Sequence, residues 1–137
     1  MTINQIQDQF IEDMSLFDEW LEKYDYIIEL GKNLGPMPNE LKRDEFKIAG
    51  CQSSVWVFPE YKDGKIHFYA DSDAVITKGI IAMLIAILSG QDAKDIVNSD
   101  LYFIEKTGLK QNLSPTRSNG LLSMVKQIKL YAQTFIK

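Results

Sequence analysis

An apolar stretch at residues 79–88 contains no charged or polar side chain and limits the folds open to this chain. A helix needs about 20 such residues to cross a bilayer, so this stretch is too short to span a membrane. A helix that is apolar on every side belongs inside a protein. The sequence therefore predicts a core helix over residues 74–88. Residues that favour helix ends flank it: Asp71, Ser72 and Asp73 before it, Ser89 and Gly90 after it.

A β-hairpin is predicted immediately before this helix. Residues 55–58 and 66–70 are rich in residues that favour strands, and the pair Asp63-Gly64 lies between them. Asp-Gly tolerates the positive φ angles of a tight hairpin turn. Apolar residues alternate along the return strand, so one of its faces should be buried. A further short strand is predicted at residues 46–48.

Apolar residues at helical spacing predict more helices on both sides of this unit. Before it, one helix covers residues 3–13, and a second, capped by Ser15, ends before Pro36. After it, Ser114-Pro115 is a favourable start for a long final helix. The predicted class is α+β, with a small antiparallel sheet and helices packed on one of its faces.

The composition is that of an ordinary folded protein. Of 137 residues, 45% are hydrophobic and 25% are charged, and the length predicts one domain, residues 1–137. The net charge is −4 without a basic stripe, which argues against nucleic acid as a partner. The first residues lack the pattern of a secretion signal, and a free thiol fits a reducing compartment. We therefore expect a cytoplasmic protein that does not use the membrane.

Cys51 is the only cysteine in the chain. It cannot form an internal disulfide, and a zinc site would need several thiolates or histidines, whereas His67 is the only histidine. The sulfur therefore works alone as a nucleophile or carrier, or is a small buried apolar residue. Gly50 permits unusual backbone angles, and Gln52 and Ser53 are polar, so we expect the thiol on a loop just before the hairpin. No metal or other cofactor is expected.

Four separated groups of residues resemble the SufE family of cysteine desulfuration proteins, and they occur in the order and spacing of that family. The groups are Gly50-Cys51-Gln52-Ser53 with Val55-Trp56, then Ala70-Asp71-Ser72-Asp73-Ala74, then Lys78-Gly79, and then Ser114-Pro115-Thr116-Arg117-Ser118-Asn119-Gly120-Leu121. Trp20 and Lys23-Tyr24 also look like the first helix of the family. The resemblance covers the chain from about residue 10 to the C-terminus.

The resemblance implies a sulfur acceptor that works with a pyridoxal-phosphate cysteine desulfurase. In that family the conserved cysteine takes sulfur from the persulfide of the desulfurase, stimulates its turnover, and passes the sulfur toward iron–sulfur cluster assembly. Cys51 matches the acceptor position. The family fold is similar to that of iron–sulfur scaffold proteins, which fits the α+β class. A scaffold complex is then the expected downstream partner, and the chain itself is either a monomer or a homodimer.

Sulfur transfer needs an ionised acceptor, because a thiolate attacks the outer sulfur of the donor persulfide. A free cysteine, with a pKa of about 8.5, is mostly protonated at pH 7. Arg117 is the candidate for stabilising the thiolate or persulfide. A cation at the start of a helix is unfavourable next to the positive end of the helix dipole, so its presence there suggests a role other than helix stability. A surface salt bridge is the alternative. Asp71 and Asp73 are either helix caps or, for one of them, a restraint on the ionisation of Cys51. Gln52 and Ser53 either donate hydrogen bonds to the sulfur or shape the turn.

A persulfide is easily reduced or oxidised, so we expect the Cys51 loop to shelter it and to swing out when the desulfurase docks, with Gly50 as the hinge. Three other functions stay open: an iron–sulfur scaffold, a thiol peroxidase or redox sensor, and a non-catalytic adaptor. A scaffold usually needs several cysteine ligands, and the chain has no resolving cysteine for redox chemistry. His67 as a general base is a further alternative, although strand alternation predicts it on the outer face of the sheet.

Overall fold

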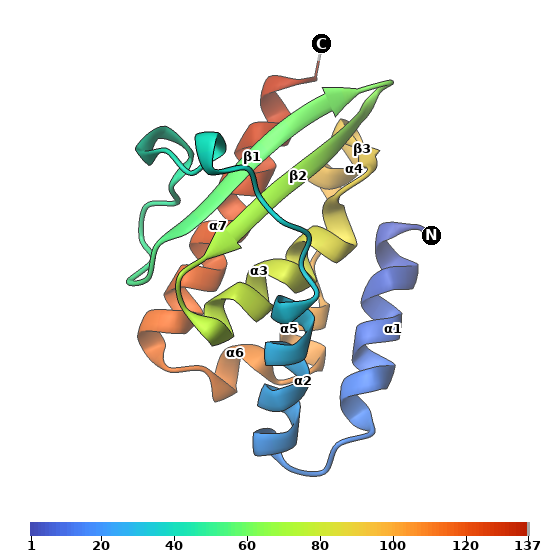
Figure 1. The fold of residues 1–137 in the computed structure, drawn as a ribbon. Helices are drawn as coiled ribbons and strands as arrows, with labels where there is room; N and C mark the ends of the chain where they lie inside the picture. Colours follow the sequence, from blue (N-terminus) through green and yellow to red (C-terminus); the bar gives the residue numbers. More distant parts are fainter. Residues whose placement is uncertain (137) are drawn as a thin grey trace.

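The computed structural model describes residues 1–136. Helices and strands follow one another in an order close to the predicted one (Figure 1). The N-terminal half consists of α1 (Ile3–Ser15), α2 (Trp20–Lys32), the short 3-10 turns η1 (Asn39–Leu41) and η2 (Asp44–Phe46), β1 (Val55–Lys62) and β2 (Lys65–Ser72). The C-terminal half consists of α3 (Val75–Leu88), β3 (Gln91–Asp92), α4 (Ala93–Asn98), α5 (Phe103–Lys106), α6 (Leu109–Asn112) and α7 (Pro115–Thr134).

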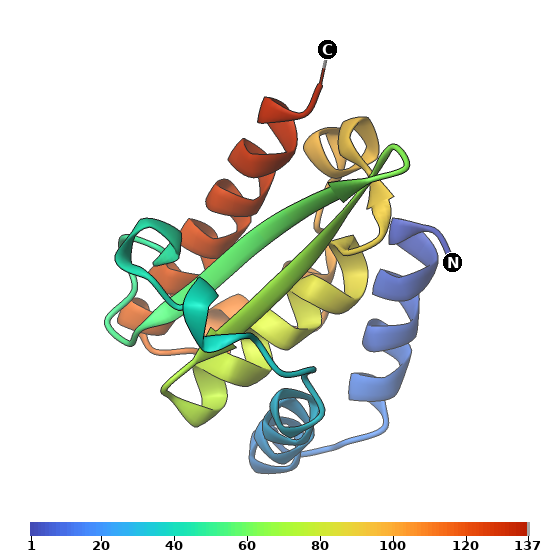
Figure 2. The ribbon, with the colours of Figure 1, turned by 45° about the horizontal axis from the view of Figure 1, so that its top comes forward.

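The sheet and the helices form two layers, which confirms the predicted α+β class. Within residues 1–136 the sheet is antiparallel with the strand order β1-β2-β3. Figures 1 and 2 show the hairpin on one side of the molecule, with α3 and α7 covering the other face of the sheet. On β2, Ile66, Phe68 and Ala70 point into this interface and are buried, as their alternation predicted.

The hairpin turn sets the register of β1 against β2. Asp63 and Gly64 have φ angles of 54° and 80°, so the Asp-Gly turn is confirmed. Val55 then pairs with Ser72, and Lys62 pairs with Lys65. This register brings the start of β1 beside the end of β2, where the predicted functional residues lie.

Helix α3 is the centre of the core, as its apolar sequence predicted. Its side chains at Ile81, Met83 and Leu84 have no exposed surface. Helix α2 crosses it closely, because a Cβ atom on Gly79 would lie only 2.2 Å from the backbone oxygen of Ile27. A Cβ atom on Gly31 would likewise lie 2.8 Å from the Gly79 nitrogen. The two helices therefore touch through their backbones.

Two predictions about the N-terminal half were wrong in detail. Ser15 does not cap the second helix: it is the last residue of α1, and its hydroxyl donates a hydrogen bond to the Glu12 carbonyl three residues back. Helix α2 begins later, at Trp20, and ends at Lys32, before the prolines.

The predicted strand at residues 46–48 is reduced to one bridge, between Lys47 and Trp56, because Phe46 belongs to the 3-10 turn η2.

The predicted caps of the core helix were also wrong. Helix α3 begins at Val75 after Ala74, and no side chain caps its first turn. Asp71 and Asp73 are engaged elsewhere, as described below. At the final helix the prediction is confirmed: the Ser114 hydroxyl accepts a hydrogen bond from the Arg117 amide, and Pro115 occupies the first turn.

Candidate functional site

Cys51 lies on a short loop that joins the buried residue Ile48 to β1. The amide of Ile48 donates a hydrogen bond of 2.8 Å to the Val55 carbonyl, and its side chain is in the core. Gly50 has a φ of 89°, a backbone angle that residues with a side chain rarely adopt, so the sharp turn before Cys51 depends on glycine. The loop therefore starts from a fixed point.

Asp73 fixes the other end of this loop. Its carboxylate accepts a hydrogen bond of 3.1 Å from the Ser54 amide, and its own amide donates one of 3.2 Å to the Ser54 carbonyl. The segment of residues 49–53 thus lies between two anchors, at Ile48 and Ser54.

The N-terminal part of α7 forms the floor under Cys51. The thiol donates a long hydrogen bond, 3.6 Å from sulfur to oxygen, to the Gly120 carbonyl. Thiols are weak donors, so this contact holds the loop only lightly. One turn further, the side chain of Ser123 packs against Gly50, where an added Cβ atom would lie 2.6 Å from the serine oxygen.

A small cavity of about 80 Å³ opens beside the thiol. Its walls come from the Cys51 loop, α3 and α7. They consist of Cys51, Gln52, Ser53, Thr77, Ile80, Thr116, Arg117, Gly120 and Met124. The structure thus brings four of the predicted residues together here: Cys51, Gln52, Ser53 and Arg117. Ile80 and Met124 are almost fully buried, so the inner wall is apolar and the outer wall is polar.

The thiol of Cys51 is half-buried, and this burial raises its pKa. At neutral pH the sulfur in the free protein is therefore protonated and a poor nucleophile. Arg117 lines the same cavity from the exposed first turn of α7, where no salt bridge within residues 1–136 engages it. Its effect on the sulfur stays a prediction.

Asp71 lies close to the loop but does not line the cavity. Its carboxylate binds Lys42 at 2.6 Å and Lys78 at 3.2 Å. Burial acts to raise the pKa of Asp71, but hydrogen bonds from Lys42, the Ser72 amide and Lys78 outweigh it, so the pKa lies below its usual value. Asp71 therefore connects the segment before the Cys51 loop to the start of α3.

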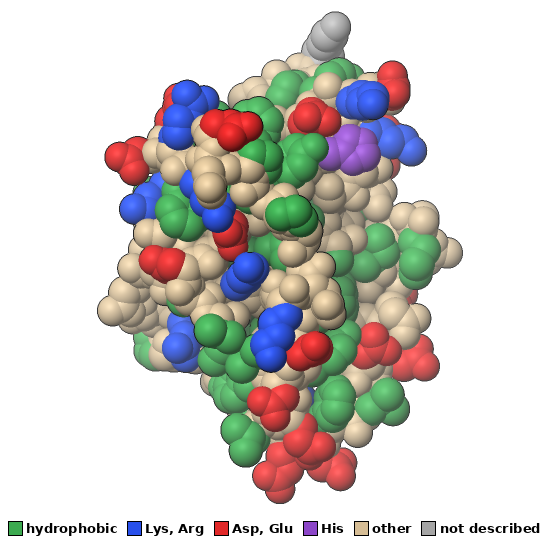
Figure 3. All heavy atoms as spheres, viewed as in Figure 1, with side chains coloured by type: hydrophobic (Ala, Val, Ile, Leu, Met, Phe, Trp, Pro, Cys, Tyr) green, Lys and Arg blue, Asp and Glu red, His purple; other side chains and the backbone are tan. Residues whose placement is uncertain are grey.

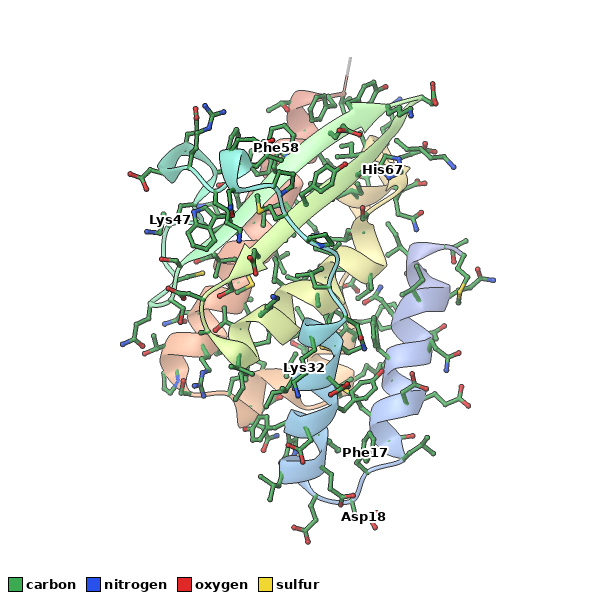
Figure 4. The ribbon with its side chains drawn as sticks, viewed as in Figure 1. Phe17, Asp18, Lys32, Lys47, Phe58 and His67 are labelled. Atoms are coloured by element: carbon green, nitrogen blue, oxygen red, sulfur yellow. The ribbon has the colours of Figure 1, made fainter. Side chains whose placement is uncertain are left out.

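His67 projects from the face of β2 that is turned away from the helices, as does Phe58 from β1 (Figure 4). The imidazole is exposed and does not line the cavity beside Cys51. The predicted position of His67 on the outer face is confirmed, and the structure gives it no contact with the sulfur.

Gly120 belongs to the last of the four family-like groups but received no role of its own from the sequence, although it contributes both a carbonyl and open space beside the sulfur. The available signal was its position: a glycine inside a long helix lowers helix stability by about 1 kcal/mol relative to alanine. A residue with that cost is a candidate for a special role.

Negative charge is concentrated around the end of α1 and the start of α2. Residues 12–25 contain six carboxylates and one lysine, a net charge of −5 against −4 for the whole chain. Figure 3 shows acidic side chains gathered where α1 meets α2, at the bottom of the view. The charged residue in the cavity wall is instead Arg117. The acidic character of the chain therefore does not come from the Cys51 site.

Among residues 1–136, no three His, Cys, Asp or Glu side chains are grouped so that they could hold a metal ion. No helix in that range combines the length and apolar character needed to cross a bilayer.

Comparisons with known proteins place these features in a family context. The SufE family, described as an Fe-S metabolism associated domain, matches residues 8–132. A SufE-like protein of Rhizobium meliloti is 42% identical over 131 residues, covering 92% of this chain and 94% of the relative. One from Rhizobium etli is 42% identical over 127 residues, covering 89% and 86%. Both relatives are described as uncharacterized.

A solution structure of a hypothetical protein from Thermus thermophilus is similar in fold. Its TM-score is 0.78 at 18% sequence identity, and the match covers 94% of both chains. At this identity the likeness supports the fold alone.

Proposed function

Because this chain belongs to the SufE family, we propose that it accepts sulfane sulfur as a persulfide on Cys51 from a pyridoxal-phosphate cysteine desulfurase. It stimulates that enzyme and delivers the sulfur to an iron–sulfur scaffold complex. Residues 1–137 act as one sulfur-acceptor domain in the reducing cytoplasm, which suits a free thiol. One observation carries this proposal: the lone thiol sits on a short loop beside a small cavity, tied to α7 by a weak hydrogen bond.

The proposed transfer is an exchange between sulfur atoms. The Cys51 thiolate attacks the outer sulfur of the persulfide on the desulfurase. A bond forms between that sulfur and Cys51, the sulfur–sulfur bond of the donor breaks, and the donor cysteine leaves as a thiolate. The proton released by Cys51 balances the one that the donor cysteine takes up. The step therefore needs no oxidant or reductant.

The half-buried position of Cys51 supports a gated acceptor. Because burial keeps the thiol protonated, the free protein should react slowly with any electrophile. Docking of the desulfurase moves residues 49–53 outward, exposes the sulfur to water and lowers its pKa. The anchors at Ile48 and Ser54 limit the movement to this segment, and Gly50 provides the hinge.

Arg117 stabilises the sulfur anion during loading. It is the cation in the wall of the Cys51 cavity, and its exposed side chain is free to follow the loop outward. Arg117→Ala should slow sulfur uptake about tenfold, whereas Arg117→Lys should keep part of the rate because it keeps the charge. Equal uptake by wild type and Arg117→Ala would remove this role.

The test of the proposed function is intact-mass analysis after incubation with a cysteine desulfurase and free cysteine. We expect a gain of one sulfur atom, reversed by a thiol reductant and absent in Cys51→Ser. Full stimulation of the desulfurase by Cys51→Ser, without sulfur uptake by the wild type, would instead identify a non-catalytic adaptor.

A further inference from the structure

Gly120 occupies an unusual place for a glycine. It lies inside α7, which spans Pro115–Thr134, and it is buried. Glycine in a helix interior is less stable than alanine by roughly 0.5–1 kcal/mol, because it loses more backbone freedom on folding. Helix stability therefore does not account for glycine at this position.

Packing of the thiol form does not require glycine here. A Cβ atom on Gly120 would lie 3.4 Å from the Cys51 sulfur and 3.9 Å from its Cα and Cβ atoms, which are ordinary contact distances. At Gly79, by contrast, the added atom would lie 2.2 Å from the Ile27 backbone oxygen, where nothing can yield. The protein with an unmodified Cys51 therefore has room for alanine at position 120.

We propose that Gly120 is a positioning residue for the cargo: its missing side chain reserves the space that the outer sulfur of the Cys51 persulfide occupies. This inference rests on the proposed function. Loading converts the Cys51 thiol and the donor persulfide into a Cys51 persulfide and the donor thiol, without net oxidation. The outer sulfur then lies about 2 Å beyond the original one. A methyl group at position 120 would compete for the same cavity of about 80 Å³.

The walls of that cavity suit a reactive sulfur that must be protected. Ile80 and Met124 form an apolar inner side and are almost fully buried, and Thr77 is also buried. The carbonyl of Gly120 accepts the hydrogen bond of the unloaded thiol. Gly120 thus serves both states, as acceptor for the thiol and as open space for the loaded sulfur.

The test compares Gly120→Ala with a matched control, Gly35→Ala, whose added methyl group meets nothing within 4 Å. Each protein is loaded with excess cysteine and catalytic desulfurase, separated from the enzyme, and treated with a small-molecule thiol reductant. The persulfide of Gly120→Ala should disappear about ten times faster than that of the wild type, while Gly35→Ala should match the wild type. An unchanged lifetime in Gly120→Ala overturns the inference.

A rescue variant separates loss of space from any other effect of the substitution. Ile80→Val removes one methyl group from the part of the cavity wall that α3 contributes and should cost about 1 kcal/mol of stability. In the double variant with Gly120→Ala the persulfide lifetime should return toward the wild-type value. A lifetime that stays short in the folded double variant contradicts the inference.

A measurement on the wild type needs no substitution. If the sulfur fills the cavity, loading should raise the midpoint of thermal unfolding by a few degrees, and reduction should reverse the rise. An unchanged or lowered midpoint means that the sulfur sits outside, which overturns the role of Gly120 but leaves sulfur acceptance intact. Absence of sulfur uptake by the wild type would contradict the proposed function itself.

Discussion

Gly31 and Gly79 bring the backbones of α2 and α3 into contact, whereas Gly50 shapes the turn before Cys51 and Gly120 lies against the Cys51 sulfur. In the first region an added methyl group would overlap backbone atoms at 2.8 Å and 2.2 Å. In the second, Gly50 meets only the end of the Ser123 side chain, and Gly120 leaves a methyl-sized gap. The first pair makes a rigid contact in the core. The second pair leaves a segment that can move and a space that can be filled.

The largest expected effect in this comparison is on stability, at Gly79. Gly79→Ala should lower the free energy of unfolding by about 3 kcal/mol, because the new methyl group overlaps fixed backbone. Gly120→Ala should leave it unchanged or raise it by up to about 1 kcal/mol. Urea unfolding of both variants measures the difference. Similar losses in the two variants would show that the two glycine regions pack in the same way.

The next largest effect on stability is expected at the ion cluster of Asp71, Lys42 and Lys78, which anchors the segment before the Cys51 loop. Asp71→Asn should cost about 2 kcal/mol at pH 7, because Lys42 and Lys78 lose their charged partner. The pKa of Asp71 is lowered by folding, so its contribution is present above the unfolded value of about 3.9 and disappears as the pH falls through the lower folded value. The difference between wild type and variant should therefore shrink in acid.

A suitable control for this variant is Asp63→Asn, on the exposed hairpin turn, where asparagine tolerates the positive φ. Urea midpoints measured from about pH 7 to pH 3 compare the variants across the unfolded value of about 3.9, where their difference begins to shrink. A loss for Asp71→Asn that is independent of pH would contradict the ionic explanation.

A smaller, local effect is expected at Asp73. Asp73→Ala removes the acceptor for the Ser54 amide and so loosens one anchor of the Cys51 loop. If the substitution lowers the free energy that holds the loop in place by about 1 kcal/mol, the thiol should react with iodoacetamide roughly five times faster than in the wild type. Asp18→Ala, at an exposed position between α1 and α2, is the control and should react at the wild-type rate. Unchanged reactivity in Asp73→Ala would mean that the loop does not depend on this anchor.

The smallest expected effect is the contribution of Cys51 to stability at alkaline pH. Burial raises the pKa of the thiol, so the fold is favoured below the unfolded value of about 8.5 and loses that contribution as the pH rises through the folded value. Wild type should lose slightly more stability than Cys51→Ala between about pH 8 and 10. Parallel curves for the two proteins would indicate an unshifted thiol.

The main elements of the fold could be predicted because local sequence specifies them. The apolar run fixes α3, the pair Asp63-Gly64 fixes the hairpin, and Ser114-Pro115 fixes the start of α7. The prediction that Ser15 caps the second helix was wrong because its hydroxyl donates a hydrogen bond back to the Glu12 carbonyl. The sequence alone does not distinguish these two arrangements.

The site was predictable only in part. The link between Ser54 and Asp73 follows from the hairpin register, which pairs Val55 with Ser72, so it could have been inferred once the turn was placed. The approach of Gly120 to Cys51 depends on how α7 packs beneath the loop, and no spacing along the chain encodes that.

The central claim is that Cys51 is sheltered in the free protein and released by its partner. Its most direct test is the rate of Cys51 alkylation, followed by intact mass on this chain, with and without a cysteine desulfurase. This shelter predicts slow modification of the free protein and at least a tenfold acceleration when the desulfurase is bound. Equal rates in the two conditions would contradict it.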